Sequence, residues 1–200
     1  MASPAKDYAD ALAAFVPEKR HAHSLNVAAA ARQLAERFAP ELADKAELAG
    51  LVHDNAKGMT VAELMEAAKR FDIEVTDIEL EQPKLLHGKV GAALLGERFS
   101  VDDPEIAQAV ADHVTGREGM GLLSEILFVA DQAASDRDFP GVEQLREMAT
   151  RDLDGAVLQV LKFKLGYLMQ KNRPIVLDWL AVYNEYVRRL RAAEAVRGRP

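Results

Sequence analysis

The chain has 200 residues, of which 49% are hydrophobic and 28% charged, and its formal net charge is −7. This is the composition of a globular protein with room for one domain, and the negative charge argues against the broad basic surface of a protein that binds duplex nucleic acid. Because there is no cysteine and no apolar segment long enough to span a membrane, disulfides, thiolate metal sites and membrane helices are excluded, and we expect a cytoplasmic protein.

Helical patterns fill the N-terminal part of the chain. Ser3-Pro4 is a candidate N-cap with proline at the first helical position, and it opens a helix through about Phe15. A second helix follows Pro17. Apolar spacing places one stripe of this helix inward: His23, Val27, Ala30 and Leu34.

A third helix is predicted from about Leu42 to the adjacent pair His53-Asp54. Thr60 and Glu63 have the spacing of a capping box, which starts a fourth helix. Lys57 therefore lies in the turn between these helices, close to the His-Asp pair.

The rest of the chain is also predicted to be helical. Residues 71–83 have a weak pattern typical of a loop or a short helix, and helical signals resume at 85–99, 104–114 and 122–135. Two long helices follow, over 153–172 and from Pro174 onward. The apolar face predicted for the last helix consists of Leu180, Tyr183, Val187 and Leu190.

With no convincing strand and no internal repeat, these patterns predict an all-α protein, a single compact bundle of roughly eight helices. We expect one domain over residues 1–200, with a metal-site core at about 18–140 and C-terminal helices at about 141–194. The basic run RRLRAAEAVRGRP is interpreted as a helix end and a frayed tail, so no nucleic-acid partner is expected.

Four of the five histidines and two aspartates lie at helix ends or beside apolar residues at helical spacing: His23, His53, His87, His113, Asp54 and Asp131. A single inward histidine is more often a hydrogen-bonded core residue than a ligand. Six such residues are more than independent core positions would supply, so we expect them to converge. Imidazole and carboxylate together suit zinc, iron or manganese, and two metals sharing a bridging carboxylate would use all six. His21 is expected to be exposed.

The ordered segments RHAHSLNV, LAGLVHDNAK, LLHGKVGA, ADHVTG, LFVAD and RDFPGVEQLRE resemble the HD-domain metal-dependent phosphohydrolases. The resemblance runs from Arg20 to about Asn184. Within that family it is strongest to the YqeK-type branch, bacterial symmetrical diadenosine tetraphosphate hydrolases.

The resemblance implies that His23, His53, Asp54, His87, His113 and Asp131 are the ligands of two metal ions. Asp54 would bridge the ions, with iron favoured and manganese, cobalt or zinc possible. His23, His53 and Asp131 would hold one ion with Asp54, while His87 and His113 help to hold the other. The resemblance also implies substrate contacts for Arg20, Lys57, Thr115, Gly116 and Arg137, with Asp54 and Lys57 as the catalytic residues.

Two of these residues also have a non-functional interpretation. The alternative for Lys57 is a solvated lysine at a helix end, and for Arg137 a surface ion pair with Asp136 or Asp138. The chain also departs from the family at Val114, where threonine is common. Residues 132–135, QAAS, stand where the family usually has an aromatic residue and Glu-Pro. The family pattern therefore does not predict the nucleotide pocket or the exact substrate of this chain.

The expected reaction is cleavage of diadenosine tetraphosphate to two ADP by a metal-bound hydroxide. An HD-type nucleotidase acting on nucleoside mono- or triphosphates is one alternative, and a non-catalytic metal- and nucleotide-binding regulatory module is another. Alarmone hydrolases are disfavoured because Asn55-Ala56-Lys57 follow the His-Asp pair, and cyclic dinucleotide phosphodiesterases because their Gly-Tyr-Pro signature is absent. The expected partner is a small-molecule nucleotide polyphosphate, with no membrane and a possible homodimer through the last helix.

Overall fold

Helices are the only regular elements in residues 4–197, the part of the chain that the computed structural model describes. They are α1 Pro4–Leu12, α2 Glu18–Phe38, α3 Ala43–Val52, α4 Val61–Arg70, α5 Asp77–Glu81, α6 His87–Ala93, α7 Leu95–Phe99, α8 Pro104–Asp112, α9 Leu122–Ala133, α10 Val142–Ala149, α11 Leu153–Gln170 and α12 Leu177–Arg197. Short 3-10 turns, η1 Pro40–Leu42 and η2 Pro83–Leu86, precede α3 and α6. The all-α class is confirmed, but these residues form twelve α-helices where about eight were predicted.

Local capping signals located several helix starts correctly. Thr60 Oγ1 accepts a hydrogen bond from the Glu63 amide at 3.2 Å, and the Glu63 carboxylate accepts one from the Thr60 amide at 2.6 Å. This capping box starts α4 as predicted. The first helix, in contrast, ends at Leu12 and not near Phe15, and the proposed N-cap Ser3 lies outside the described residues.

The extra helices arise where packing divides a continuous pattern. The stretch predicted as one helix over 85–99 breaks at Leu94, which contributes to a small core cluster beneath α4, whereas Leu95 enters the main core. The break thus lies where the chain passes from one cluster to the other. Helix α10 was not predicted because it is only eight residues long and rich in charge.

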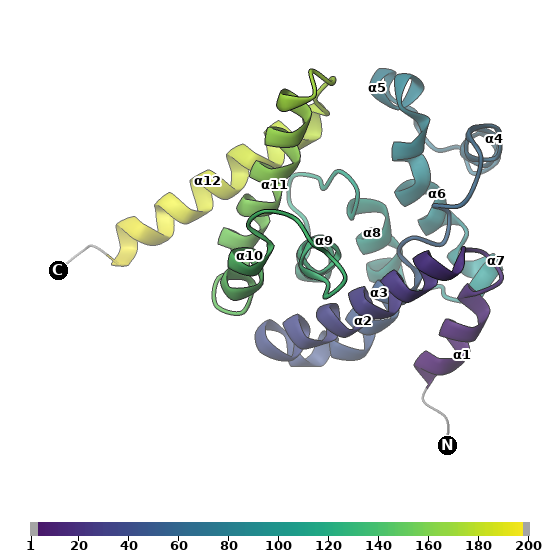
Figure 1. Cartoon of the computed structure of the whole chain (residues 1–200), viewed down its shortest axis with the longest axis horizontal. Coiled ribbons are helices and arrows are strands. Elements are labelled where there is room, and N and C mark those ends of the chain that lie inside the picture. Colours follow the sequence, from purple (N-terminus) through teal and green to yellow (C-terminus); the bar gives the residue numbers. More distant parts are fainter. Residues whose placement is uncertain (1–3, 198–200) are drawn as a thin grey trace.

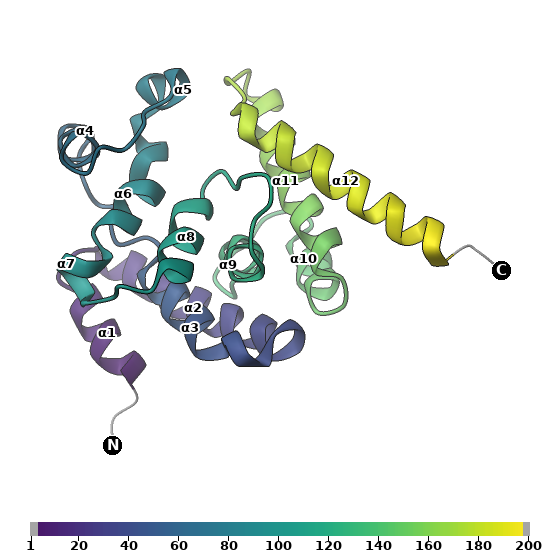
Figure 2. The same ribbon diagram turned by 180° about the vertical axis from the view of Figure 1, so that it is seen from behind.

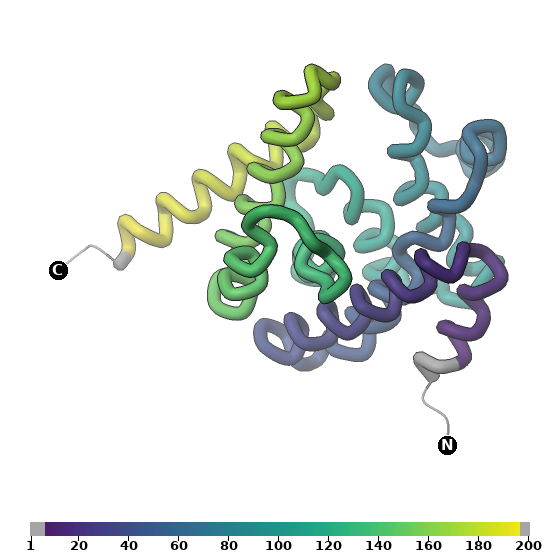
Figure 3. Tube along the Cα trace, in the orientation of Figure 1, coloured from purple at the N-terminus to yellow at the C-terminus, as the bar shows by residue number. Residues whose placement is uncertain are grey.

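Helix α2 forms the base of the bundle, packing along α3 and across α9 (Figure 1). A Cβ atom on Gly50 would lie 2.6 Å from the Ala28 Cα atom, so only glycine allows α2 and α3 to approach this closely. Viewed from behind, α4 to α7 stand on one side of α8 and α9, and the α11–α12 hairpin stands on the other (Figure 2). The Cα trace shows α1 and the C-terminal part of α12 on opposite sides of the molecule (Figure 3).

The buried face of α12 includes three of the four predicted residues, since Tyr183, Val187 and Leu190 pack against the core as partly buried side chains. Trp179, Val182 and Tyr186 are buried, whereas Leu180 remains 40% exposed. The Tyr186 hydroxyl donates to Glu125 Oε1 at 2.6 Å. A buried carboxylate on α9 needs such a partner, and the apolar pattern of α12 alone does not reveal this contact. None of the helices in residues 4–197 is long and apolar enough to cross a membrane.

Candidate metal and phosphate site

The six predicted metal ligands come from five places in the sequence and lie together in the centre of the bundle. All six are buried: His23, His53, Asp54, His87, His113 and Asp131. His23 lies within α2 and Asp131 in the last turn of α9. The other four lie at helix ends: His53 and Asp54 directly after α3, His87 at the start of α6 and His113 directly after α8. Helix ends thus bring side chains from distant segments to one point.

Asp54 lies between two groups of histidines. Its Oδ1 atom is 3.2 Å from His87 Nε2 and 3.5 Å from His113 Nε2, while its Oδ2 atom is 3.7 Å from His53 Nε2. Ligand atoms of His23, His53 and Asp54 lie within 4.8 Å of one another, and so do those of Asp54, His87 and His113. The two oxygens of one carboxylate therefore face two separate triads.

Asp131 adds a second carboxylate to the first triad. Its Oδ1 atom is 3.0 Å from His23 Nε2 and 3.9 Å from His53 Nε2. Burial alone would raise the pKa of Asp131, but its hydrogen bond with His23 and the charge of Arg137 hold that pKa well below the usual range. The carboxylate is therefore ionised at neutral pH, as a ligand must be.

Three of the histidines are oriented in the same way by their own backbone. The Nδ1–H groups of His53, His87 and His113 each donate to the carbonyl oxygen three residues earlier, at 2.7, 2.6 and 2.7 Å. These bonds fix the tautomer and direct each Nε2 lone pair toward Asp54.

The atoms at this centre fit a metal ion. His53 Nε2 is buried and has no hydrogen-bond partner among the described residues, an arrangement that is costly unless something else satisfies it. Burial lowers the pKa of His53 to about 4, and burial also lowers the pKa of His87 and His113. All three rings are thus neutral at pH 7, as metal binding requires.

Asp136 is a residue that the sequence analysis missed in this role. Its Oδ2 atom accepts a hydrogen bond from His23 Nδ1 at 2.8 Å. A carboxylate on the outer nitrogen of a histidine orients the ring and raises its basicity. No spacing signal connects residues 23 and 136, so this contact becomes visible only in the folded chain.

Arg137 does not form the surface ion pair considered for it. Its Nε atom donates to the Asp131 carbonyl at 2.7 Å, and its Nη2 atom donates to Asp131 Oδ1. His21 also differs from expectation, because it is half-buried and its ring donates to the Ala9 carbonyl at 2.8 Å.

Two more cations reach the same centre. Lys57 Nζ donates to His87 Nε2 at 2.9 Å and lies 3.9 Å from Asp54 Oδ1, and Arg20 Nη1 donates to Asp54 Oδ2 at 3.2 Å. Burial lowers the pKa of Lys57, although Asp54 and Asp131 oppose this effect. Lys57 is thus placed among the predicted ligands and is not a solvated helix-end lysine.

These side chains line a cavity of about 390 Å³, here called the central cavity. Its described lining contains five cationic residues, Arg20, Lys57, Lys84, Arg137 and Lys164, and two carboxylates, Asp54 and Asp131. A local excess of positive charge inside a protein with a net charge of −7 suits a small polyanion.

Part of the central cavity was not anticipated. Lys84, Lys164 and Trp179 line it, and the last two come from α11 and α12, far from every sequence motif. Val114 also lines the cavity, whereas the predicted nucleotide contacts Thr115 and Gly116 are not among its lining residues.

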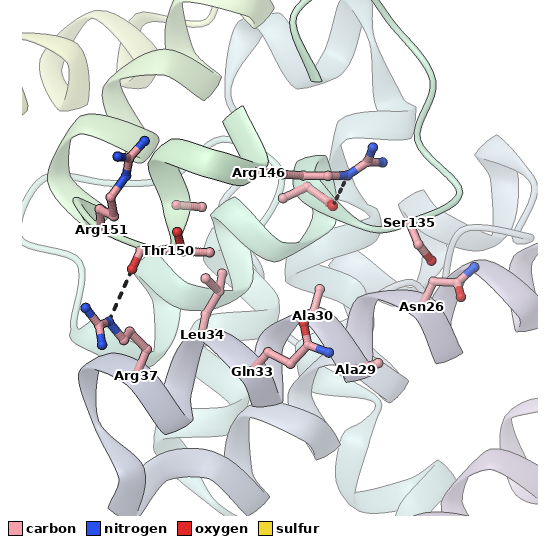
Figure 4. Close-up of a pocket in the computed structure, with 12 residues that line it drawn as sticks. Asn26, Ala29, Ala30, Gln33, Leu34, Arg37, Ser135, Arg146, Thr150 and Arg151 are labelled. Carbon is pink, nitrogen blue, oxygen red and sulfur yellow. Dashed lines mark hydrogen bonds between the residues drawn. The ribbon is translucent and has the colours of Figure 1, made fainter. Parts of the chain in front are cut away.

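A larger cavity of about 580 Å³ lies between α2 and α10, and no predicted site residue is among its described lining (Figure 4). Arg146 there donates to the carbonyls of Ala133, Ala134 and Arg137. Its guanidinium group thus holds the segment that carries Arg137 into the central cavity.

Comparison with known proteins agrees with this geometry. The model of the HD domain family matches residues 20–178, and the chain belongs to this family. The symmetrical bis(5'-nucleosyl)-tetraphosphatases of Halalkalibacterium halodurans and Bacillus subtilis are similar to it, with 38% identity over 168 residues and 36% over 167. Each alignment covers 84% of this chain and 89% of the relative.

A solved structure has the same fold. The chain named as an HD superfamily hydrolase involved in NAD metabolism, from Clostridium acetobutylicum, superposes with a TM-score of 0.88 and is 32% identical. The match covers 94% of this chain and 99% of that one. The HD-type fold predicted from the ordered motifs is therefore confirmed.

Proposed function

We propose that this protein hydrolyses symmetrical dinucleoside tetraphosphates, with diadenosine tetraphosphate cleaved to two ADP. The observation that carries the proposal is the pair of triads that share Asp54, beside a central cavity whose lining contains Asp54 and five cationic side chains. The names of the similar bacterial tetraphosphatases supply the substrate.

We further propose that the six buried ligands hold two divalent cations, with Asp54 as the bridge and iron as the native metal. Manganese, cobalt and zinc fit the same nitrogen and oxygen donors. When bound, the two cations would activate a water molecule and neutralise phosphate oxygens.

The side chains of the cavity have separate tasks in this proposal. Arg20, Lys57 and Arg137 bind the tetraphosphate, and Lys57 and Arg137 neutralise the charge that develops on the leaving phosphate. Asp136 keeps the His23 ring oriented through the hydrogen bond at its outer nitrogen. Water attacks an inner phosphorus, the central phosphoanhydride bond breaks, and each half leaves as ADP.

The domain extent, the location in the cell, the oligomeric state and the absence of nucleic-acid binding stay predictions. These are one domain over residues 1–200, a cytoplasmic location, a homodimer through α12 and the absence of nucleic-acid partners. The HD-type nucleotidase and the non-catalytic regulatory module also remain alternatives, because both could use the same ligands.

A product-resolved screen tests the function. The purified protein is assayed with iron, manganese, cobalt or zinc against diadenosine tetraphosphate, nucleoside mono- and triphosphates, cyclic dinucleotides and NAD. We expect ADP as the sole nucleotide product from diadenosine tetraphosphate, with the highest kcat/KM, and two metals per chain. AMP with ATP as products, or bound nucleotide without turnover, would contradict the proposal.

Lys57→Met tests the phosphate role of the lysine. The substitution keeps most of the apolar stem and removes the charge, so metal content and Tm should hardly change. We expect kcat and kcat/KM to fall together by roughly ten- to a thousandfold, because the contact strengthens as charge builds on the leaving phosphate. Lys69→Met, at an exposed lysine on α4, is the matched control. A rise in KM alone would show uniform substrate binding instead.

A further inference from the structure

A second cavity, of about 500 Å³, adjoins the central cavity beside α11. Lys164 and Gln132 line both cavities, so these two side chains form the boundary between them. We call it the aromatic cavity, because Phe139, Phe163 and Tyr167 contribute its aromatic side chains. None of these three residues has a role in the function proposed above.

Two of the aromatic rings are held in place. Phe139 and Phe163 pack edge to face, with ring centroids 5.3 Å apart and an interplanar angle of 76°. Gly141 lies against Phe163, and a Cβ atom there would be 2.9 Å from the Phe163 Cζ atom. The wall is therefore preformed, which limits the entropy lost when a ligand binds.

One side of the aromatic cavity is formed by the exposed ring of Tyr167 and by the free space beside Gly166. Phe163, Gly166 and Tyr167 share one face of α11 because they are three and four residues apart. Tyr167 is 52% exposed, and a Cβ atom on Gly166 would have no other heavy atom within 4 Å. A planar group can thus approach the helix at Gly166 and stack against Tyr167.

The boundary between the cavities carries charge and is tied to the central cavity. Lys164 Nζ donates to the Val114 carbonyl at 2.8 Å and lies 4.2 Å from the centroid of the Phe128 ring. Gln132 Nε2 donates to Asp131 Oδ2 at 2.8 Å. A polyphosphate that leaves the central cavity in this direction passes an ammonium group before it reaches the aromatic rings.

We propose that the aromatic cavity binds one nucleobase of a dinucleoside polyphosphate whose phosphates occupy the central cavity. The base stacks on Tyr167, and the adjoining phosphates pass Lys164. This inference rests on the proposed function, and it predicts a preference for a nucleoside polyphosphate over a base-free polyphosphate. Stacking of bases on aromatic side chains tolerates different bases, so the cavity selects an aromatic base without selecting adenine.

Two variants test the aromatic cavity, one by removing a side chain and the other by adding one. Tyr167→Ala removes the exposed ring, and Gly166→Leu adds a side chain at a position where a Cβ atom has no other heavy atom within 4 Å. Tyr167→Phe keeps the ring, and Met169→Ala changes another exposed side chain of α11, so both serve as controls. Calorimetry measures the Kd of a diadenosine tetraphosphate analogue with a methylene group at the central bridge. The base-free comparison is inorganic tetraphosphate.

We expect Tyr167→Ala and Gly166→Leu to raise the Kd of the analogue by roughly five- to a hundredfold, the loss of one stacked base. The Kd of inorganic tetraphosphate and the metal content should stay unchanged, and both controls should match the wild type. An unchanged Kd for the analogue, or an equal rise for both ligands, would overturn the inference. If only turnover of diadenosine tetraphosphate is missing in the wild type, the proposed function fails while the base site stands. If the wild type hydrolyses diadenosine tetraphosphate but neither variant changes the Kd of the analogue, the proposed function stands and the base site fails.

Discussion

Asp54→Ala is expected to reduce turnover to background and to lower the metal content at both positions. The two oxygens of Asp54 face different triads, Oδ1 toward His87 and His113 and Oδ2 toward His53. No other described carboxylate lies between both groups in this way. Removing it therefore weakens both predicted metal positions at once.

Metal analysis and the hydrolysis assay on the same preparation provide the measurement. Asp54→Asn is a useful companion, because it keeps the shape of the side chain while removing the negative charge. Circular dichroism shows whether the variants fold, which matters because Arg20 loses its hydrogen-bond partner. Retained activity in folded Asp54→Ala would end the binuclear proposal.

The parts of the fold that could be predicted are those fixed by local chemistry. Thr60 and Glu63 start α4 through hydrogen bonds across a single turn. Asp103 likewise accepts hydrogen bonds from the amides of Glu105 and Ile106 at the start of α8. Such caps depend on residues only two or three positions apart, so a sequence pattern contains all the necessary information.

The polar contacts of α12 could not be predicted, because they depend on a distant buried acid. Glu125 on α9 accepts hydrogen bonds from Tyr186 and Arg189, which are 61 and 64 residues away. Tyr183, Val187 and Leu190 pack against the core as predicted, but the most buried positions of α12 are Trp179, Val182 and Tyr186. Hydrophobic spacing describes only residues within one helix, so it contains no information about these distant polar contacts.

The candidate site also contains residues that could be predicted from the sequence and residues that could not. The predicted metal ligands were visible in the sequence because each is a histidine or aspartate at an inward position or helix end. Lys164 and Trp179 belong to helices without a sequence motif, and only the position of the α11–α12 hairpin brings them to the lining of the central cavity. Gln132 was noticed only as a departure from the family pattern, yet it contacts Asp131 and separates the two cavities.

His113→Ala is expected to keep one metal ion and lose most of the activity. The His113 ring lies on the Oδ1 side of Asp54, and its Nε2 atom is 3.2 Å from His87 Nε2. The other triad, with Asp131 beside it, contains no atom of His113. One predicted position should therefore remain occupied while the other loses a ligand.

Activity should fall by roughly a hundredfold or more, because the charge stabilisation of the second cation is lost from the transition state. His21→Ala is the matched control, since it removes a histidine that bonds to the Ala9 carbonyl and does not line the central cavity. Metal content per folded chain is measured beside kcat for both variants. Two metals in His113→Ala, or none, would contradict the assignment of His113 to one position, whereas a single metal with residual turnover supports two ions that act together across Asp54.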